Sequence, residues 1–169
     1  MPTHIDPCSL AVAPIVPICR DAPLSHATGF VWLAEDGAYL ITNWHVVAGR
    51  RTDNAQPLSE DKGWVPDRLL ARFLHWDGAE TIATQYDIAL YDAEGKPTWF
   101  WHPVYGRQVD VVALRLTSRA PESGYRAINQ VALDRDLWTQ VGMDVFILGY
   151  PLNRKRRSQA TALSSIDGA

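Results

Sequence analysis

The sequence of 169 residues contains 47% hydrophobic and 21% charged residues, and its formal net charge is −3. This balance is typical of a globular chain and excludes a disordered or low-complexity protein. A slightly negative net charge gives no global attraction to nucleic acid or to anionic membranes, so binding of either kind would have to be local. A chain of this length buries about 70% of the surface that its unfolded form exposes, which is enough for one hydrophobic core.

The N-terminal segment has no features of a targeting signal. Residues 1–9 lack a basic region and are expected to form a tail, and Pro14 and Pro17 interrupt the apolar stretch that follows. No other apolar run approaches the roughly 18 residues that cross a bilayer. The two cysteines, Cys8 and Cys19, suit reduced thiols in a reducing compartment. We therefore expect a cytoplasmic protein that has no membrane partner.

The first predicted strands lead to a single histidine. Residues 12–19 are expected to form an edge strand, because proline lacks the N–H that a central strand uses. Two apolar runs, 29–33 and 39–41, flank the turn signal Asp36-Gly37 and predict a β-hairpin. His45 follows the second of these strands, and residues 46–49 after it are expected to form one helical turn.

Further turn signals separate β-branched and aromatic runs along the rest of the chain. Residues 68–76 and 81–91 are joined across Asp77-Gly78 and predict a second hairpin. Residues 98–102 are expected to add an edge strand, and residues 133–141 a short helix. This spacing of short strands predicts an all-β barrel.

The residues around His45 resemble a known family. Ala27-Thr-Gly-Phe, an apolar strand and Leu40-Ile-Thr-Asn-Trp-His-Val-Val-Ala-Gly49 resemble the histidine segment of trypsin-like serine peptidases, especially the high-temperature-requirement type. Residues 109–116 resemble the family's aspartate strand, and residues 141–151 its next strand, of the form G-x-x-V-x-x-x-G-Y-P. These matches occur in the order that the family has.

The resemblance implies an all-β, chymotrypsin-like fold in which the first barrel is complete and the second is partial. The matches place a truncated peptidase domain at about residues 10–155. The remaining residues, 156–169, are expected to form a frayed C-terminal segment.

The resemblance also implies hydrolysis of peptide bonds by a Ser-His-Asp triad. His45 would be the general base, and a carboxylate would accept its other ring N–H and hold the tautomer. Asp110 is the favoured carboxylate, because residues 110–142 leave room for one strand and one loop. Asp87 is the rival, since Tyr86-Asp-Ile-Ala-Leu90 has a similar form. For Asp87 we prefer a structural interpretation, in which it starts a strand and accepts backbone N–H bonds.

The nucleophile loop of the family, G-x-S-G-G or G-x-S-G-S, has no counterpart in these residues. Cys8 and Cys19 precede His45 and do not fit a cysteine nucleophile. We therefore expect this chain to carry only the histidine and the aspartate of the triad and to be inactive as it stands. None of the serines has the required glycine-flanked turn: Ser9, Ser25, Ser59, Ser118, Ser123, Ser158, Ser164 and Ser165.

No metal ion or other cofactor is expected. The remaining histidines lie outside i, i+4 pairs and C-x-x-C contexts, which argues against a metal site. These histidines are His4, His26, His75 and His102.

The aromatic segment 99–103 is predicted to pack over the barrel, although a sugar or peptide platform is the alternative. The basic run 154–157 is expected to be a solvated loop, because it has no aromatic sheet or groove-binding helix beside it.

Three functions are consistent with the sequence. The favoured one is a serine endopeptidase acting on a polypeptide substrate, of which this chain is a part. The others are a non-catalytic, protease-like binding module and a nucleic-acid-associated protein that uses the basic run 154–157. The sequence leaves the oligomeric state open.

Overall fold

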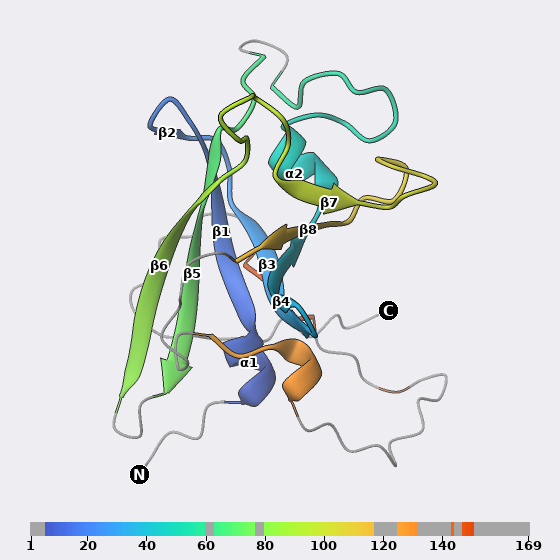
Figure 1. Ribbon diagram of the computed structural model, residues 1–169. Coiled ribbons are helices and arrows are strands. Elements are labelled where there is room, and N and C mark those ends of the chain that lie inside the picture. Colours follow the sequence, from blue (N-terminus) through green and yellow to red (C-terminus); the bar gives the residue numbers. More distant parts are fainter. Residues whose placement is uncertain are drawn as a thin grey trace.

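A computed structural model describes residues 6–59, 63–76, 80–116, 125–131, 143 and 147–150. In this part of the chain, eight strands form one sheet in the order β6-β5-β1-β3-β4-β8-β7, and β2 pairs with β1 (Figure 1). All of these strand pairs are antiparallel. The predicted all-β class is therefore confirmed. The strands are β1 (Val12–Cys19), β2 (Ala22–Pro23), β3 (Ala27–Ala34), β4 (Gly37–Thr42), β5 (Arg68–Trp76), β6 (Thr81–Ala89), β7 (Trp99–Trp101) and β8 (Val112–Arg115).

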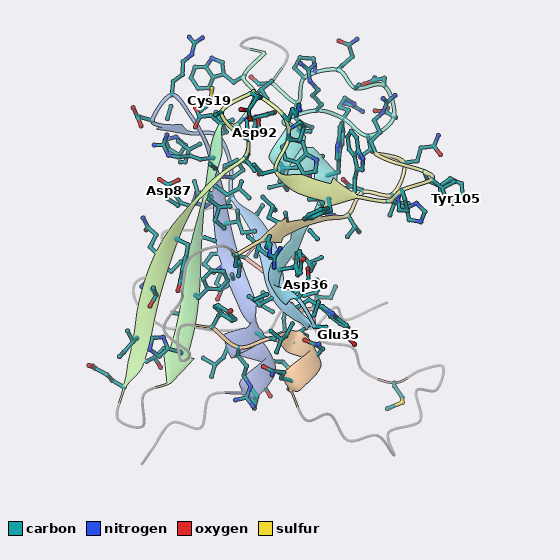
Figure 2. The ribbon with its side chains drawn as sticks, in the orientation of Figure 1. Cys19, Glu35, Asp36, Asp87, Asp92 and Tyr105 are labelled. Atoms are coloured by element: carbon teal, nitrogen blue, oxygen red, sulfur yellow. The ribbon has the colours of Figure 1, made fainter. Side chains whose placement is uncertain are left out.

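Both predicted hairpins are present. In the first, β3 pairs with β4 and Ala34 lies opposite Gly37, so the loop consists of Glu35 and Asp36, one residue earlier than the turn signal indicates. Figure 2 shows both acidic side chains at this end of the sheet. In the second, β5 and β6 pair along their whole length. The strand β6 ends at Ala89, two residues before the predicted end, and the N–H of the fully buried Leu90 still donates to the carbonyl of Asp67.

The prediction that residues 12–19 form an edge strand is wrong. β1 lies between β3 and β5 in the sheet. Its first half, up to Ile15, pairs with β3, and its second half, from Ile15, pairs with β5. Pro14 and Pro17 therefore each lie where β1 has only one of these two neighbours, and the missing N–H can face the unpaired side.

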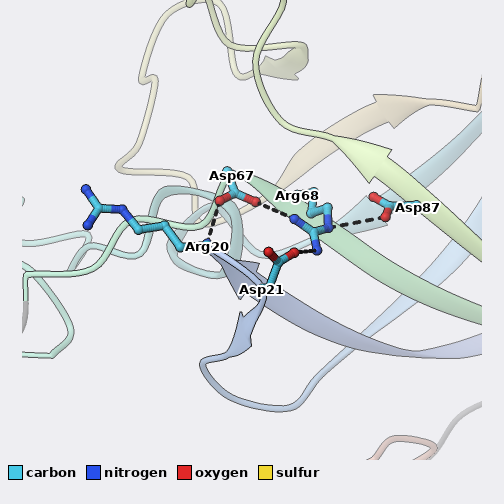
Figure 3. Close-up of polar contacts among 5 residues, drawn as sticks. All are labelled: Arg20, Asp21, Asp67, Arg68 and Asp87. Atoms are coloured by element: carbon cyan, nitrogen blue, oxygen red, sulfur yellow. Dashed lines mark hydrogen bonds and ion pairs between the residues drawn. The ribbon is translucent and has the colours of Figure 1, made fainter.

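The turn between β1 and β2 is tied to the second hairpin by charged groups (Figure 3). Arg20 and Asp21 both have positive φ values, 48° and 66°, in this two-residue loop. Arg68, at the start of β5, forms ion pairs with Asp21 at 2.6 Å, Asp67 at 3.3 Å and Asp87 at 3.2 Å. The backbone N–H of Arg20 donates to the carboxylate of Asp67. These contacts hold a turn that L-residues adopt at an energetic cost.

One face of the strands forms the core. Along β4, Leu40 is fully buried, and Leu114 of the neighbouring β8 points into the same core. In the aromatic segment 99–103, Trp99 is buried, whereas Phe100 and Trp101 are 59% and 53% exposed. Only Trp99 of these three packs as predicted; the alternation of side chains along a strand accounts for the exposure of Phe100 but not for that of Trp101. The largest buried side chains include Phe73, Ile15, Leu40, Leu69, Leu90, Leu114, Val31, Val47 and Val112.

The remaining predictions concern the N-terminal and C-terminal segments of the chain. Helix α1 (Pro7–Ala11) occupies part of the segment predicted to be a tail, and the side chain of Asp6 caps it by accepting the N–H groups of Cys8 and Ser9. The predicted helix at 133–141, the basic run 154–157 and the segment 156–169 lie outside the described residues. None of the described helices is both long and apolar enough to span a membrane.

Candidate active site

His45 is positioned by a short helix at the end of β4. Helix α2 (Trp44–Ala48) begins after Asn43, and Gly49 ends it in the left-handed conformation, with φ of 61°. The N–H of Gly49 donates to the carbonyl of His45. A Cβ atom at residue 49 would lie 2.7 Å from the Cδ of Pro66, so the chain needs glycine here for space as well as for conformation. Figure 1 shows α2 at one end of the sheet, close to β7.

Asp110 reaches the same helix from the segment that precedes β8. The N–H of Val111 donates to the carbonyl of Val109 at 2.7 Å, which makes Asp110 the central residue of a three-residue turn. β8 then pairs with β4, with Val112 opposite Thr42. This register brings the turn beside the start of α2.

The carboxylate of Asp110 contacts His45 at two points. Oδ2 lies 2.6 Å from the ring Nδ1, and Oδ1 accepts the backbone N–H at 2.9 Å. An ionised carboxylate only accepts hydrogen bonds, so a neutral ring paired with it carries its proton on Nδ1, and the lone pair of Nε2 is then free to accept a proton. The two side chains are 40% and 33% exposed, so the pair is partly open to solvent.

Asn43 makes a third contact with Asp110. Its Nδ2 donates to the backbone carbonyl of Asp110 at 2.9 Å. Asn43 was not predicted from the sequence to be part of the site. An asparagine directly before a helical turn predicts a capping side chain, but the side chain makes no capping bond here, so the local pattern does not point to its contact with Asp110.

The rival carboxylate lies elsewhere in the fold. Asp87 belongs to β6, where Figure 2 shows it on the strand's outer side, and its described partner is Arg68. It lies within the strand, so the expectation that it starts a strand is wrong. The structure thus brings Asp110, and not Asp87, into contact with His45.

The other described histidines do not join this site. His26 is exposed between β2 and β3, and His75 lies in β5. The Nδ1 of His102 accepts the N–H groups of Val104 and Tyr105 and so shapes the loop after β7. Among the described residues, no group of three or more His, Cys, Asp or Glu side chains could hold a metal ion.

A shallow groove of about 440 Å³ lies beside α2. Trp44 forms part of it, together with the loop that follows α2 and the loop that follows β7. The two loops are joined by a hydrogen bond from the Nε of Arg107 to the carbonyl of Thr52. The lining residues are Trp44, Thr52, Asp53, Trp101, Val104, Tyr105, Gly106, Arg107 and Gln108.

A family model described as a trypsin-like peptidase domain matches residues 27–168, a span that contains both His45 and Asp110. Neither the curated proteins nor the solved structures provide a match.

Proposed function

Because this chain belongs to the trypsin-like peptidase domain family and has its all-β, chymotrypsin-like fold, we propose that it carries the general base and the orienting acid of a serine endopeptidase. In this proposal His45 is the base, Asp110 orients it, and the substrate is a polypeptide. The observation that carries the proposal is the 2.6 Å contact between the ring Nδ1 and the Asp110 carboxylate.

The proposed mechanism follows from which ring nitrogen is free. Nε2 takes the proton of a serine hydroxyl as that oxygen attacks the scissile carbonyl carbon, and later donates it to the leaving amine. Asp110 stabilises the imidazolium that forms in between, and it stays ionised throughout. The carboxylate also prevents the ring from rotating, since it holds Nδ1 while the backbone N–H of His45 fixes the carboxylate itself.

The nucleophile and the oxyanion hole are not assigned to residues of this sequence. No serine in the 169 residues lies in the glycine-flanked loop that supplies both in this family. We propose that such a loop belongs to the full-length gene product and that the chain by itself is inactive.

A cytoplasmic location is part of the proposal. It is supported by the thiols of Cys8 and Cys19, which are both free in the structure. Free thiols are typical of proteins in a reducing compartment.

The test is labelling of the folded, full-length gene product with a serine-directed fluorophosphonate. We expect labelling in the wild type and its loss in His45→Ala. The matched control is His26→Ala, which removes an exposed histidine outside the site and should leave labelling unchanged. A folded wild-type protein that is not labelled would overturn the proposal and favour a non-catalytic binding module.

A further inference from the structure

The start of α2 has an unusual division of roles between two side chains. Asn43 is the N-cap residue, with extended φ and ψ values of −78° and 146°, yet its side chain accepts no N–H from the helix. An N-cap side chain normally accepts the N–H of the second or third helical residue. Here His45 is that second residue, and its N–H goes to Oδ1 of Asp110. The cap is therefore supplied by a residue from a distant part of the chain.

The side chain of Asn43 is a hydrogen-bond donor here, whereas a capping side chain is an acceptor. Its Nδ2 donates to the backbone carbonyl of Asp110. A carbonyl oxygen accepts hydrogen bonds only, so this contact requires the amide nitrogen of Asn43 and not its oxygen. Asp110 is the central residue of a tight turn, and holding its carbonyl restricts the rotation of the peptide plane next to the carboxylate-bearing Cα.

We propose that Asn43 is a positioning residue for the His45–Asp110 pair, which it orients by holding the backbone of Asp110. This inference rests on the proposed function, because it concerns how the same base is oriented. The side-chain hydrogen bond of Asn43 goes to the backbone of Asp110, not to the ring or the carboxylate. It acts through the carbonyl of Asp110, and the carboxylate in turn holds the ring in its Nδ1–H form.

An ordinary capping role makes the opposite prediction for one substitution. Aspartate is as good an N-cap as asparagine, and a negative charge is favourable at a helix N-terminus. If Asn43 only capped α2, Asn43→Asp would keep or raise stability and leave the ring unchanged. Under the proposal, the new carboxylate cannot donate to the Asp110 carbonyl, and it competes with Asp110 for the N–H of His45.

The measurement is the tautomer of His45, read from the ¹⁵N shifts of a ¹⁵N-histidine-labelled protein at a pH where the ring is neutral. We expect the Nδ1–H form in the wild type, with solvent exchange of that proton roughly fivefold faster in Asn43→Ala, the size that the loss of one hydrogen bond produces. In Asn43→Asp we expect a larger increase and a mixture of both tautomers.

Asn129→Asp is the matched control. The side chain of Asn129 donates to the carbonyl of Leu33 and accepts its N–H beside the β3–β4 hairpin loop, whereas α2 follows the other end of β4. This variant loses the same donor and should leave the His45 signals unchanged. Wild-type signals in a folded Asn43→Asp would overturn the proposal. If Asn43→Asp does not fold, Asn43→Ala decides, and unfolding of both while Asn129→Asp folds would also overturn it in favour of a structural role.

The outcome is separable from that of the proposed function. The tautomer measurement needs neither a serine nor a substrate, so an altered tautomer in Asn43→Asp would support the positioning role even if the fluorophosphonate did not label the protein. Labelling that depends on His45, together with an unchanged tautomer in Asn43→Asp, would keep the proposed function and overturn the positioning role.

Discussion

Asp110 holds His45 through both of its carboxylate oxygens, although 65 residues separate the two in the chain. One oxygen accepts the backbone N–H at the start of α2, and the other lies against the ring. The same carboxylate therefore helps to define where the helix begins and how the imidazole is oriented. Changes at residue 110 should affect the ring more than the fold, because an amide can still accept the backbone N–H.

Asp110→Asn should separate these two roles. Its amide oxygen can keep the N–H of His45, whereas its NH₂ group would face Nδ1 and force the proton onto Nε2. We expect labelling of the full-length protein to slow by roughly ten-thousandfold, the loss that this triad template shows for the same change. Thermal unfolding should change little. Asp87→Asn is the control, and slower labelling in that variant with a normal Asp110→Asn would make Asp87 the orienting acid.

Two glycines with nearly the same conformation should respond differently to alanine. Gly49 and Gly63 have φ values of 61° and 57°. A Cβ atom at residue 49 would lie 2.7 Å from Pro66, whereas one at residue 63 has no atom within 4 Å. We expect Gly63→Ala to cost about 1 kcal/mol for the left-handed backbone, and Gly49→Ala about 2–4 kcal/mol because it is also overpacked. Urea unfolding measures both, and equal losses would contradict the packing argument.

Tyr39→Phe should change how stability depends on pH. The hydroxyl of Tyr39 donates to Asp36 at 2.6 Å. This bond lowers the pKa of Asp36 from its usual 3.8 and raises the pKa of Tyr39 from its usual 10.0. Because the pKa of the Asp36 carboxyl is lowered, this group stabilises the fold above pH 3.8. That stabilisation is lost as the pH falls through the folded-state pKa. Because the pKa of Tyr39 is raised, its hydroxyl stabilises the fold below pH 10.0. That stabilisation is lost as the pH rises through the folded-state pKa.

The difference in unfolding free energy between wild type and Tyr39→Phe should therefore be largest between these two limits and shrink beyond each. Denaturant melts across the pH range measure it. Tyr105→Phe serves as the control, because this exposed tyrosine makes a ring contact with His102 and no hydroxyl bond to an acid among the described contacts. A constant difference at all pH values would show that Asp36 is not the partner in solution.

Arg20→Asn should stabilise the turn between β1 and β2. Asparagine tolerates the left-handed conformation better than arginine does, and Arg20 has φ of 48°. The turn keeps its bond to Asp67, because that bond uses the backbone N–H. We expect a gain of roughly 0.5 kcal/mol, with Arg51→Asn as a control outside the positive-φ region. A loss of stability in Arg20→Asn would show that its side chain contributes more than its backbone strain costs.

The hairpins and the place of His45 could be predicted from local patterns. Apolar alternation on both sides of Asp36-Gly37 and Asp77-Gly78 marks strands that pair with their nearest neighbour in sequence, and such pairs follow from turn chemistry. The position of β1 could not be predicted in this way. Pro14 and Pro17 argue against a central strand only where that strand is paired on both sides, and the switch from β3 to β5 at Ile15 is decided by long-range pairing.

By itself, the sequence determined the all-β class, the two hairpins, and the histidine at the end of β4, because each depends on residues that are close in the chain. The tertiary structure decided which carboxylate meets that histidine. Asp87 and Asp110 begin similar apolar runs, and only the pairing of β8 with β4 brings Asp110 to α2, while the pairing of β6 with β5 leaves Asp87 beside Arg68. The roles of Asn43 and Asp110 at the start of α2 were decided in the same way. A capping bond can be made by any acceptor that the fold places at the helix end, and no local pattern shows that it comes from 65 residues away.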